Sequence, residues 1–264
     1  MPLQTDPAAK RVAVISTPRS GNTWIRAMLA TALGVRHHAW QTPAEVDPNT
    51  LPSGFVLQMH KRYNAAFSDW LAGHQFHVLT IARHPFDVLI SILHFCRHDS
   101  SPSQWLGGWP GSENTIREAT PRSRTFLDYA TGPRAKDLLA VSTDWWNRQR
   151  VVRTRYEEFV ANPVGELAKV VGHYGQATVD LNEVVDAHLI GYLRPQVTNH
   201  HFWQGRPGLW RSLLTVPEAE ELIHAHAMTL STYGYTANPD SSLTPEMADG
   251  NWAAVVAPAR RVAA

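Results

Sequence analysis

Short runs of apolar, mostly β-branched residues alternate along the chain with longer segments in which apolar residues recur at helical spacing. Three of these runs, at residues 11–16, 54–59 and 77–82, are bounded by polar or turn-forming residues. Runs of this length and composition are typical of parallel strands that are buried on both faces. A fourth run, 151–155, is less apolar but lies between two helix-like segments, which is the order expected of β-α-β units.

The longer segments predict helices at residues 22–33, 85–97, 140–150, 164–174 and 217–233. Several of them have a proline in the first turn, where its missing N–H breaks no helical hydrogen bond. Strands that alternate with helices in this way predict a three-layer α/β domain, in which a parallel sheet has helices on both faces. In such open sheets, ligands bind at the carboxyl ends of the strands.

Two further segments show no clear strand or helix pattern. Residues 99–134 are rich in Gly, Pro and Ser, with Trp105 and Trp109 among them, and we interpret them as a long functional loop or lid. Residues 238–264 are predicted to form a loosely packed tail. A chain of 264 residues is expected to fold as one domain, residues 1–264, whose core spans about 11–234.

The overall charge gives no reason to expect a polyanionic partner. The formal net charge is +1, and the sequence contains no basic stripe of the kind that binds nucleic acid or an anionic membrane. No segment approaches the roughly 20 apolar residues that span a bilayer, and the N-terminus lacks the apolar core of a signal peptide. The single cysteine, Cys96, excludes an internal disulfide. We therefore expect a cytoplasmic protein in which any anion site is local.

The first apolar run leads directly into a stretch of small and polar residues, STPRSGNTWIR, at 16–26. A strand that passes through such a turn into a helix presents backbone N–H groups and a helix N-terminus to an anion. Gly21 permits a close approach of the backbone, and Arg19 supplies a planar, charged guanidinium. The stretch lacks the first glycine and the Gly-Lys pair of the ATPase phosphate loop, GxxxxGK[ST].

Two blocks of this sequence resemble one protein family. TPRSGNTW, at 17–24, resembles the 5′-phosphosulfate-binding loop of the sulfotransferases that use 3′-phosphoadenosine 5′-phosphosulfate (PAPS), commonly written YPKSGTTW. IARHPFDVLISILHF, at 81–95, resembles the family's 3′-phosphate block, R-x-P-x-D-x-x-x-S, with Arg83, Pro85, Asp87 and Ser91 in the matching places. Arg83 and Ser91 can converge on one phosphate, to which an arginine donates charge-assisted hydrogen bonds worth roughly 1.5–3 kcal/mol each.

The resemblance implies a P-loop-like sulfotransferase fold and the transfer of a sulfuryl group from PAPS to an acceptor hydroxyl, with 3′-phosphoadenosine 5′-phosphate (PAP) as the product and no metal required. It also implies a set of cofactor-binding residues: Arg19, Ser20, Gly21, Asn22, Thr23, Trp24, Arg83, Ser91, Tyr156, Gly205 and Arg206. Trp24 and Tyr156 would flank the adenine, since RYEEF at 155–159 resembles the family's YED segment.

Gly205 and Arg206 belong to GRPGLWR, at 205–211, which resembles the family's RKGxxGDWK stretch over the 3′-phosphate. The match is incomplete, because Trp203 and Gln204 take the places of the Arg and Lys, and Leu209 takes that of the Asp. The contact that closes over the 3′-phosphate is therefore the least supported part of the predicted site.

His60 is the candidate general base. It falls just past the end of the predicted strand 54–59, in a segment that resembles the family's K-x-H segment, whose His is the base. A histidine accepts a proton near neutral pH, and such catalysis typically contributes 10²- to 10⁴-fold. Arg19 is the second predicted catalytic residue, at the leaving oxygen. Gln58 replaces the Lys of the K-x-H segment, which leaves Lys61, Arg62 or Arg206 as candidates for the missing charge.

Two other functions stay open. A small-molecule kinase of the P-loop superfamily is disfavoured by the missing Gly-Lys pair and by the separate Arg83 and Ser91 site. A catalytically silent nucleotide-binding protein stays in consideration because of Gln58 and the incomplete segment at 205–211.

His94 and His98 have a spacing that suits zinc but lack a second ligand pair. The acceptor, a sugar, phenol, lipid or natural product, is not identified by the sequence; residues 99–134 and 199–204 are candidates to line its cleft.

Overall fold

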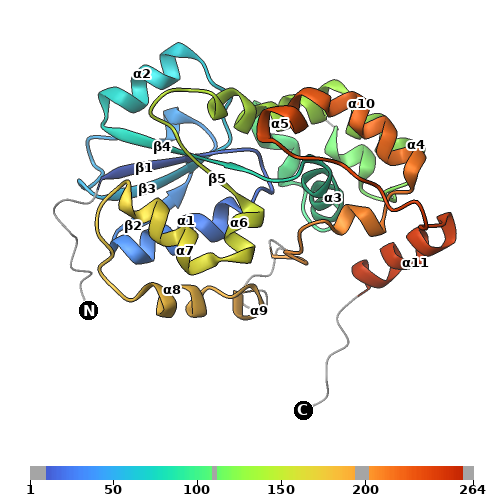
Figure 1. Ribbon diagram of the computed structural model, residues 1–264. Coiled ribbons are helices and arrows are strands. Elements are labelled where there is room, and N and C mark those ends of the chain that lie inside the picture. Colours follow the sequence, from blue (N-terminus) through green and yellow to red (C-terminus); the bar gives the residue numbers. More distant parts are fainter. Residues whose placement is uncertain (1–9, 109–111, 194–201, 258–264) are drawn as a thin grey trace.

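A computed structural model describes residues 10–108, 112–193 and 202–257 of the chain (Figure 1). Its centre is a parallel sheet of five strands in the order β2-β3-β1-β4-β5. The strands are β1 (Arg11–Ile15), β2 (Arg36–Ala39), β3 (Phe55–Met59), β4 (Phe76–Ala82) and β5 (Val152–Arg155). The four predicted strands are confirmed to within one residue at each end, and they lie side by side in the sheet.

Burial explains why four strands were predictable and one was not. The middle strand, β1, pairs with β3 and β4, and its residues 12–15 are fully buried because both faces of the sheet are covered. The edge strand, β2, has the sequence RHHA, and all four of its residues are exposed. It is held by its ladder to β3 rather than by an apolar pattern.

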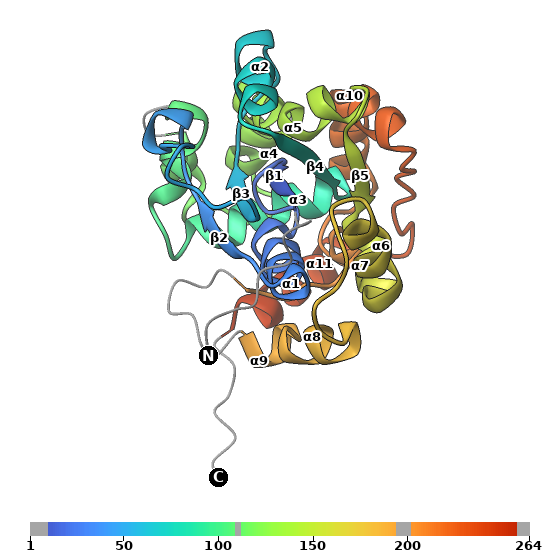
Figure 2. The same ribbon diagram turned by 90° about the vertical axis from the view of Figure 1, so that its left-hand side faces the viewer.

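Helices cover both faces of the sheet (Figure 2). Val12 and Val14 point toward one face and Ala13 and Ile15 toward the other, because side chains alternate along a strand. The first face packs against α1 (Asn22–Leu33), α6 (Tyr156–Ala161), α7 (Pro163–Gly172) and α8 (Leu181–Ala187), and the second against α2 (Ala65–Gly73) and α5 (Pro133–Trp146). The predicted three-layer α/β architecture is confirmed.

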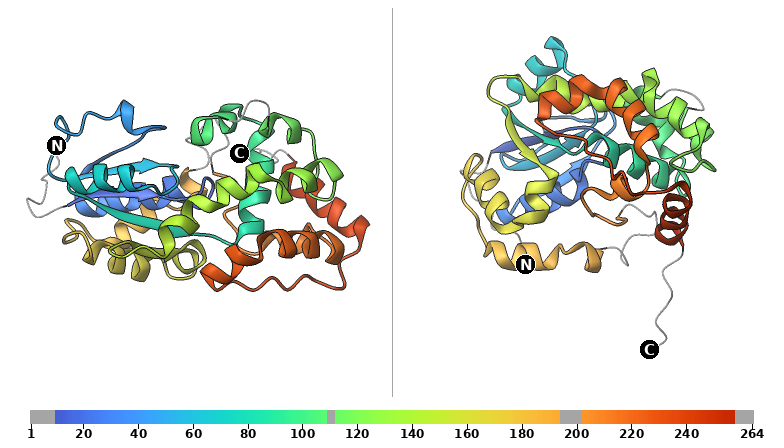
Figure 3. Two further views of the ribbon diagram at one scale, coloured as in Figure 1. Left: turned by 90° about the horizontal axis from the view of Figure 1, so that it is seen from above. Right: turned by 45° about the vertical axis from the view of Figure 1, so that its right-hand side comes forward.

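A third group of helices lies beyond the carboxyl ends of the strands (Figure 3, left). It shares one apolar cluster and consists of α3 (Pro85–Cys96), α4 (Arg124–Thr131), α10 (Val216–Tyr233) and α11 (Pro245–Val256), with the 3₁₀ helices η2 (Ser101–Gly107), η3 (Glu113–Ile116) and η5 (Leu209–Ser212). The short elements η1 (Pro43–Glu45) and α9 (Ile190–Leu193) complete the described chain. No helix of this described part is long and apolar enough to cross a membrane.

The prediction of a long loop at 99–134 is wrong. The segment contains η2, η3, α4 and the beginning of α5, and it buries Trp105, Ile116 and Phe126. A buried ion pair between Arg134 and Glu113, 2.6 Å long, holds it against α5. The small and polar residues that suggested a loop include helix caps: the Ser123 side chain accepts a hydrogen bond from the backbone N–H of Phe126 at the start of α4. Trp109 lies outside the described residues.

Two other boundaries also differ from the prediction. The helix predicted at 140–150 runs over Pro133–Trp146, because Pro133 occupies its first turn directly after Gly132. The predicted tail at 238–264 instead contains α11, which Thr244 caps and which buries Ala248 and Trp252 against the third helical group. Residues 258–264 lie outside the described part of the chain. The other four predicted helices are confirmed as α1, α3, α7 and α10.

Candidate active site

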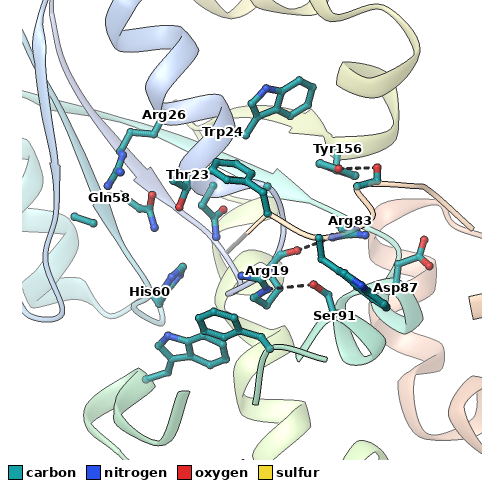
Figure 4. Close-up of a pocket in the computed structure, with 18 of the residues that line it drawn as sticks. Arg19, Thr23, Trp24, Arg26, Gln58, His60, Arg83, Asp87, Ser91 and Tyr156 are labelled. Carbon is teal, nitrogen blue, oxygen red and sulfur yellow. Dashed lines mark hydrogen bonds between the residues drawn. The ribbon is translucent and has the colours of Figure 1, made fainter. Parts of the chain in front are cut away.

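A cavity of about 390 Å³ opens at the carboxyl ends of β1, β3 and β4 (Figure 4). Most of the residues predicted to bind a cofactor or to act in catalysis lie in its wall: Arg19, Gly21, Asn22, Thr23, Trp24, His60, Arg83, Ser91, Tyr156 and Gly205. Two predicted residues do not, since Ser20 is buried within the turn and the Arg206 side chain is exposed to solvent. The fold therefore brings together residues that are far apart in the sequence.

The turn between β1 and α1 is held by its own side chains. Ser16 hydrogen-bonds the Asn22 side chain, and Asn22 Nδ2 donates to the Thr17 carbonyl over 2.8 Å. The Thr17 backbone N–H donates to Ser142 on α5 over 2.7 Å. The side chain of Asn22 is thus used inside the turn, and no side chain caps the N-terminus of α1. Residues 21–24, at this end of α1, lie in the cavity wall, and a helix N-terminus is a favourable place for an anion.

Gly21 is required for two reasons. Its backbone has φ +88°, a left-handed conformation that favours glycine. A β-carbon at this position would also lie 2.5 Å from the Tyr156 ring, which is closer than van der Waals contact allows. The close approach of the turn to Tyr156 therefore depends on the missing side chain.

Arg19, Arg83 and Ser91 form what we call the Arg83 end of the cavity. Arg19 Nε donates to Ser91 Oγ over 3.1 Å, and its guanidinium lies 4.4 Å from the centre of the Phe95 ring. Arg83 Nη1 donates to the Arg19 carbonyl over 2.9 Å, and its guanidinium lies 4.5 Å from the centre of the Tyr156 ring. Burial, together with the charge of Arg83, lowers the pKa of Arg19 to about 10. Two half-buried guanidinium groups in one cavity wall favour a bound anion.

Asp87, which matches the family's 3′-phosphate block, has a structural role in this chain. Its carboxylate accepts hydrogen bonds from the backbone N–H groups of Gly208, over 2.6 Å, and Trp210, over 3.1 Å. Tyr156 holds the same segment by donating its hydroxyl to the Gly205 carbonyl over 2.8 Å. These contacts hold residues 205–210 against the Arg83 end of the cavity. Burial raises the pKa of Asp87, an effect that the charge of Arg83 opposes.

His60 is oriented by the end of the first strand. Its Nδ1 lies 2.7 Å from the carbonyl oxygen of Ser16. Because a carbonyl oxygen only accepts hydrogen bonds, Nδ1 carries the ring proton and Nε2 keeps its lone pair. Burial lowers the pKa of His60 to about 4; the hydrogen bond to Ser16 acts in the opposite direction, and the charges of Arg19 and Arg26 lower it further. The ring is therefore neutral at pH 7 and able to accept a proton.

None of the three basic residues proposed to replace the charge missing at Gln58 lies in the cavity wall. The Lys61 ammonium lies 5.6 Å from the centre of the Phe67 ring, and Arg62 forms ion pairs of 2.7 and 2.8 Å with Asp137 and Asp144. Arg206 is exposed.

The wall instead contains Arg26, which the sequence reading missed. Arg26 follows Asn22 by one helical turn on α1, and that spacing places both on the same face of the helix. Burial lowers the pKa of its guanidinium to about 10. Arg26 is half-buried, with its Nε and Nη1 atoms buried, and its neighbour Gln58 is buried. We refer to Arg26, Gln58 and His60 as the His60 end of the cavity.

Aromatic residues line the rest of the wall. Trp24 and Tyr156 pack edge to face with their ring centres 6.1 Å apart, and Trp24 Nε1 donates to the His188 carbonyl over 2.7 Å. His94, considered as a zinc ligand, stacks on Trp203 with the ring centres 4.0 Å apart. Of the predicted cleft residues at 199–204, only 202–204 belong to the described chain, and all three lie in the wall.

No protein-family model matches the sequence, and no curated protein shows significant sequence similarity to it. The structure, by contrast, is similar to that of mouse sulfotransferase SULT7A1 complexed with PAP, with a TM-score of 0.57 at 15% identity over 89% of this chain and 92% of that one. It is also similar to retinol dehydratase in complex with androsterone and the inactive cofactor PAP, with a TM-score of 0.52 at 13% identity over 93% of this chain and 86% of that one. The chain therefore has the sulfotransferase fold that its two sequence blocks predicted.

Proposed function

We propose that this chain is a sulfotransferase that transfers the sulfuryl group of PAPS to a hydroxyl group of an acceptor molecule. The observation that carries the proposal is that one cavity has in its wall the turn between β1 and α1 together with Arg19, Arg83 and Ser91, which are linked by hydrogen bonds. PAPS has phosphate groups at both its 5′ and 3′ positions, whereas ATP has none at the 3′ position. The fold shared with proteins crystallised with PAP supports the same conclusion.

The residues present fit such a nucleotide. Arg83 Nε is buried and has no hydrogen-bond partner among the described residues, so a phosphate oxygen would satisfy it. The start of α1 has no side-chain cap and lies in the cavity wall, where a phosphate would meet its N–H groups. Trp24 and Tyr156, both in the wall, would contact the adenine, and Gly205, also in the wall, would lie at the 3′-phosphate.

When bound, PAPS supplies an activated sulfuryl group and leaves as PAP. His60 Nε2 accepts the proton of the acceptor hydroxyl, while the bond from Nδ1 to the Ser16 carbonyl holds the ring in the required tautomer. Arg19 and the N–H groups at the start of α1 stabilise the negative charge that develops on the 5′-phosphate. Arg83 and Ser91 hold the 3′-phosphate. We infer no metal ion in this mechanism, since these side chains provide the positive charge.

The acceptor would be a small molecule that enters beside His60. The wall there includes Trp40 and Trp105, and the Trp105 ring packs against His60 with the ring centres 6.1 Å apart. The structurally similar retinol dehydratase was crystallised with androsterone and with retinol. An apolar wall of this kind suits an acceptor with a ring or an alkyl body.

Calorimetric titrations with PAP and with ATP test the proposal. We expect PAP to bind at least tenfold more tightly, because only PAP places a phosphate on Arg83 and Ser91. The exposed residue Arg153 provides a charge-matched control, and Arg153→Met should give the wild-type ratio of affinities. Equal affinities for the two nucleotides, or no binding of PAP, would overturn the assignment. Magnesium-dependent turnover of ATP would support a kinase instead.

A further inference from the structure

We propose that Arg26 and Gln58 form a binding site for a sulfate-type oxyanion at the His60 end of the cavity, separate from the two phosphate sites. Figure 4 shows Arg26, from α1, beside Gln58, from β3, on the side of the cavity where His60 lies and away from Arg83 and Asp87. Both side chains belong to the wall. No residue of this pair was expected from the sequence to bind a ligand.

Hydrogen bonding is the first argument. Arg26 Nε and Nη1 are buried and have no acceptor among the described residues, and Gln58 Oε1 is buried without a donor. Buried polar groups in proteins are nearly always hydrogen-bonded, so such a cluster needs a partner. Gln58 alone cannot satisfy Arg26, because one amide oxygen does not match two N–H donors held in a planar fork. A ligand with two or more oxygen acceptors does.

Charge is the second argument. Five arginines of the described residues have a carboxylate partner: Arg62, Arg122, Arg124, Arg134 and Arg155. Arg26 has none among the described residues: burial lowers its pKa, and no acidic side chain of this part of the chain opposes that shift. Asp87 is the only carboxylate that the described residues contribute to the wall, and it is bound to Gly208 and Trp210. The positive charge of Arg26 therefore has no counterpart in the described protein.

The chemistry of the pair identifies the ligand class. A guanidinium binds tetrahedral and planar oxyanions through two parallel hydrogen bonds. The NH2 group of the Gln58 amide can donate to the same oxyanion. If the proposed function holds, two groups would meet this description beside His60: the transferable sulfo group of PAPS, and an anionic substituent of the acceptor. The shared chemistry is a sulfate-type oxyanion next to the base.

Inorganic sulfate is the probe for the site. It is titrated into protein saturated with PAP, which fills both phosphate sites, and binding is followed by equilibrium dialysis with labelled sulfate. We expect Arg26→Met to weaken sulfate binding at least tenfold, Arg26→Lys to restore part of it, and Gln58→Leu to weaken it by less. Arg153→Met is the charge-matched control and should bind as the wild type does. Equal sulfate affinity in Arg26→Met and wild type would overturn the inference.

Two further measurements separate the sources of the oxyanion. If it is the sulfo group of the donor, Arg26→Met will bind PAPS about tenfold more weakly and PAP equally well. If it is a group of the acceptor, both nucleotides will bind with unchanged affinity while sulfate binding is lost. The proposed function is tested separately: it fails if the wild-type protein does not bind PAP. In that case the sulfate site is still tested, by comparing sulfate binding to wild type and to Arg26→Met in the absence of PAP. Unchanged thermal midpoints exclude a folding defect.

Discussion

The two ends of the cavity hold their charged side chains in different ways. At the Arg83 end, the residues are linked to one another, since the Arg19 side chain donates to Ser91 and Arg83 donates to the Arg19 backbone carbonyl. At the His60 end, only His60 is fixed, through Nδ1, while buried atoms of Arg26 and Gln58 lack partners among the described residues.

The difference has a physical consequence for binding. Linked and stacked guanidinium groups lose little conformational freedom when a phosphate arrives, so the Arg83 end suits tight, selective binding of a nucleotide. Unpartnered buried groups carry a desolvation cost that a ligand relieves. The affinity of the His60 end therefore depends strongly on which group of a ligand occupies it. We therefore expect substitutions at the Arg83 end to change affinity and substitutions of His60 to change turnover.

The largest effect should come from His60→Gln. Removing the base should lower kcat about 10²- to 10⁴-fold, the usual contribution of a general base, while the affinity for PAP stays the same. Single-turnover measurements and PAP titrations of the same preparation test this. The matched control is His224→Gln, at an exposed histidine of α10. Wild-type turnover in His60→Gln would show that His60 is not the general base, and it would contradict the distinction between the two ends of the cavity.

Arg83→Met should give the complementary result. Loss of a charge-assisted contact to the 3′-phosphate should weaken PAP binding about 10- to 100-fold, corresponding to roughly 1.5–3 kcal/mol. AMP, which has no 3′-phosphate, should lose much less affinity. Calorimetry with both nucleotides provides the comparison, and Arg153→Met again serves as the control. An equal loss for AMP and PAP would show that Arg83 holds the turn rather than the 3′-phosphate.

The smallest effect concerns stability and pH. The pKa of His60 is about 4 in the folded protein and near 6.5 in the unfolded chain, so below pH 6.5 the unfolded chain takes up a proton that the folded protein does not. The stability associated with the neutral ring is complete above pH 6.5 and is lost as the pH falls toward 4. Between pH 7 and 5.5, the free energy of unfolding should fall by about 1 kcal/mol more in wild type than in His60→Gln. Urea unfolding at the two pH values measures this, and parallel losses would contradict the assigned pKa.

The part of the molecule around the phosphate-binding turn could be predicted because its signals are local. β1 is predicted by an apolar run, and α1 by the helical repeat that comes shortly after it in the sequence. β3 and β4 are predicted by apolar runs of the same kind. Parallel strands end at one edge of their sheet, so His60 and Arg83, which come directly after β3 and β4, had to lie near the turn.

The rest depends on contacts that a single sequence does not display. β2 forms because its backbone pairs with that of β3. α11 is stable because Trp252 packs into an apolar cluster formed by helices that are distant in the sequence. Segment 99–134 looked like a loop because caps such as Ser123 also occur in turns. Arg26 could be placed on the correct face of α1 by helical spacing, but only the folded structure shows that its Nε and Nη1 are buried without a partner among the described residues.

Arg19 has a backbone φ of +67°, although left-handed residues are usually glycines. For other residues this conformation costs about 1 kcal/mol or more, and glycine would relieve the cost while removing the guanidinium from Ser91 and Phe95. Thermal stability and the proposed activity therefore favour different residues at position 19. Arginine at this position therefore holds its guanidinium in the cavity wall at a cost in stability that glycine would not carry.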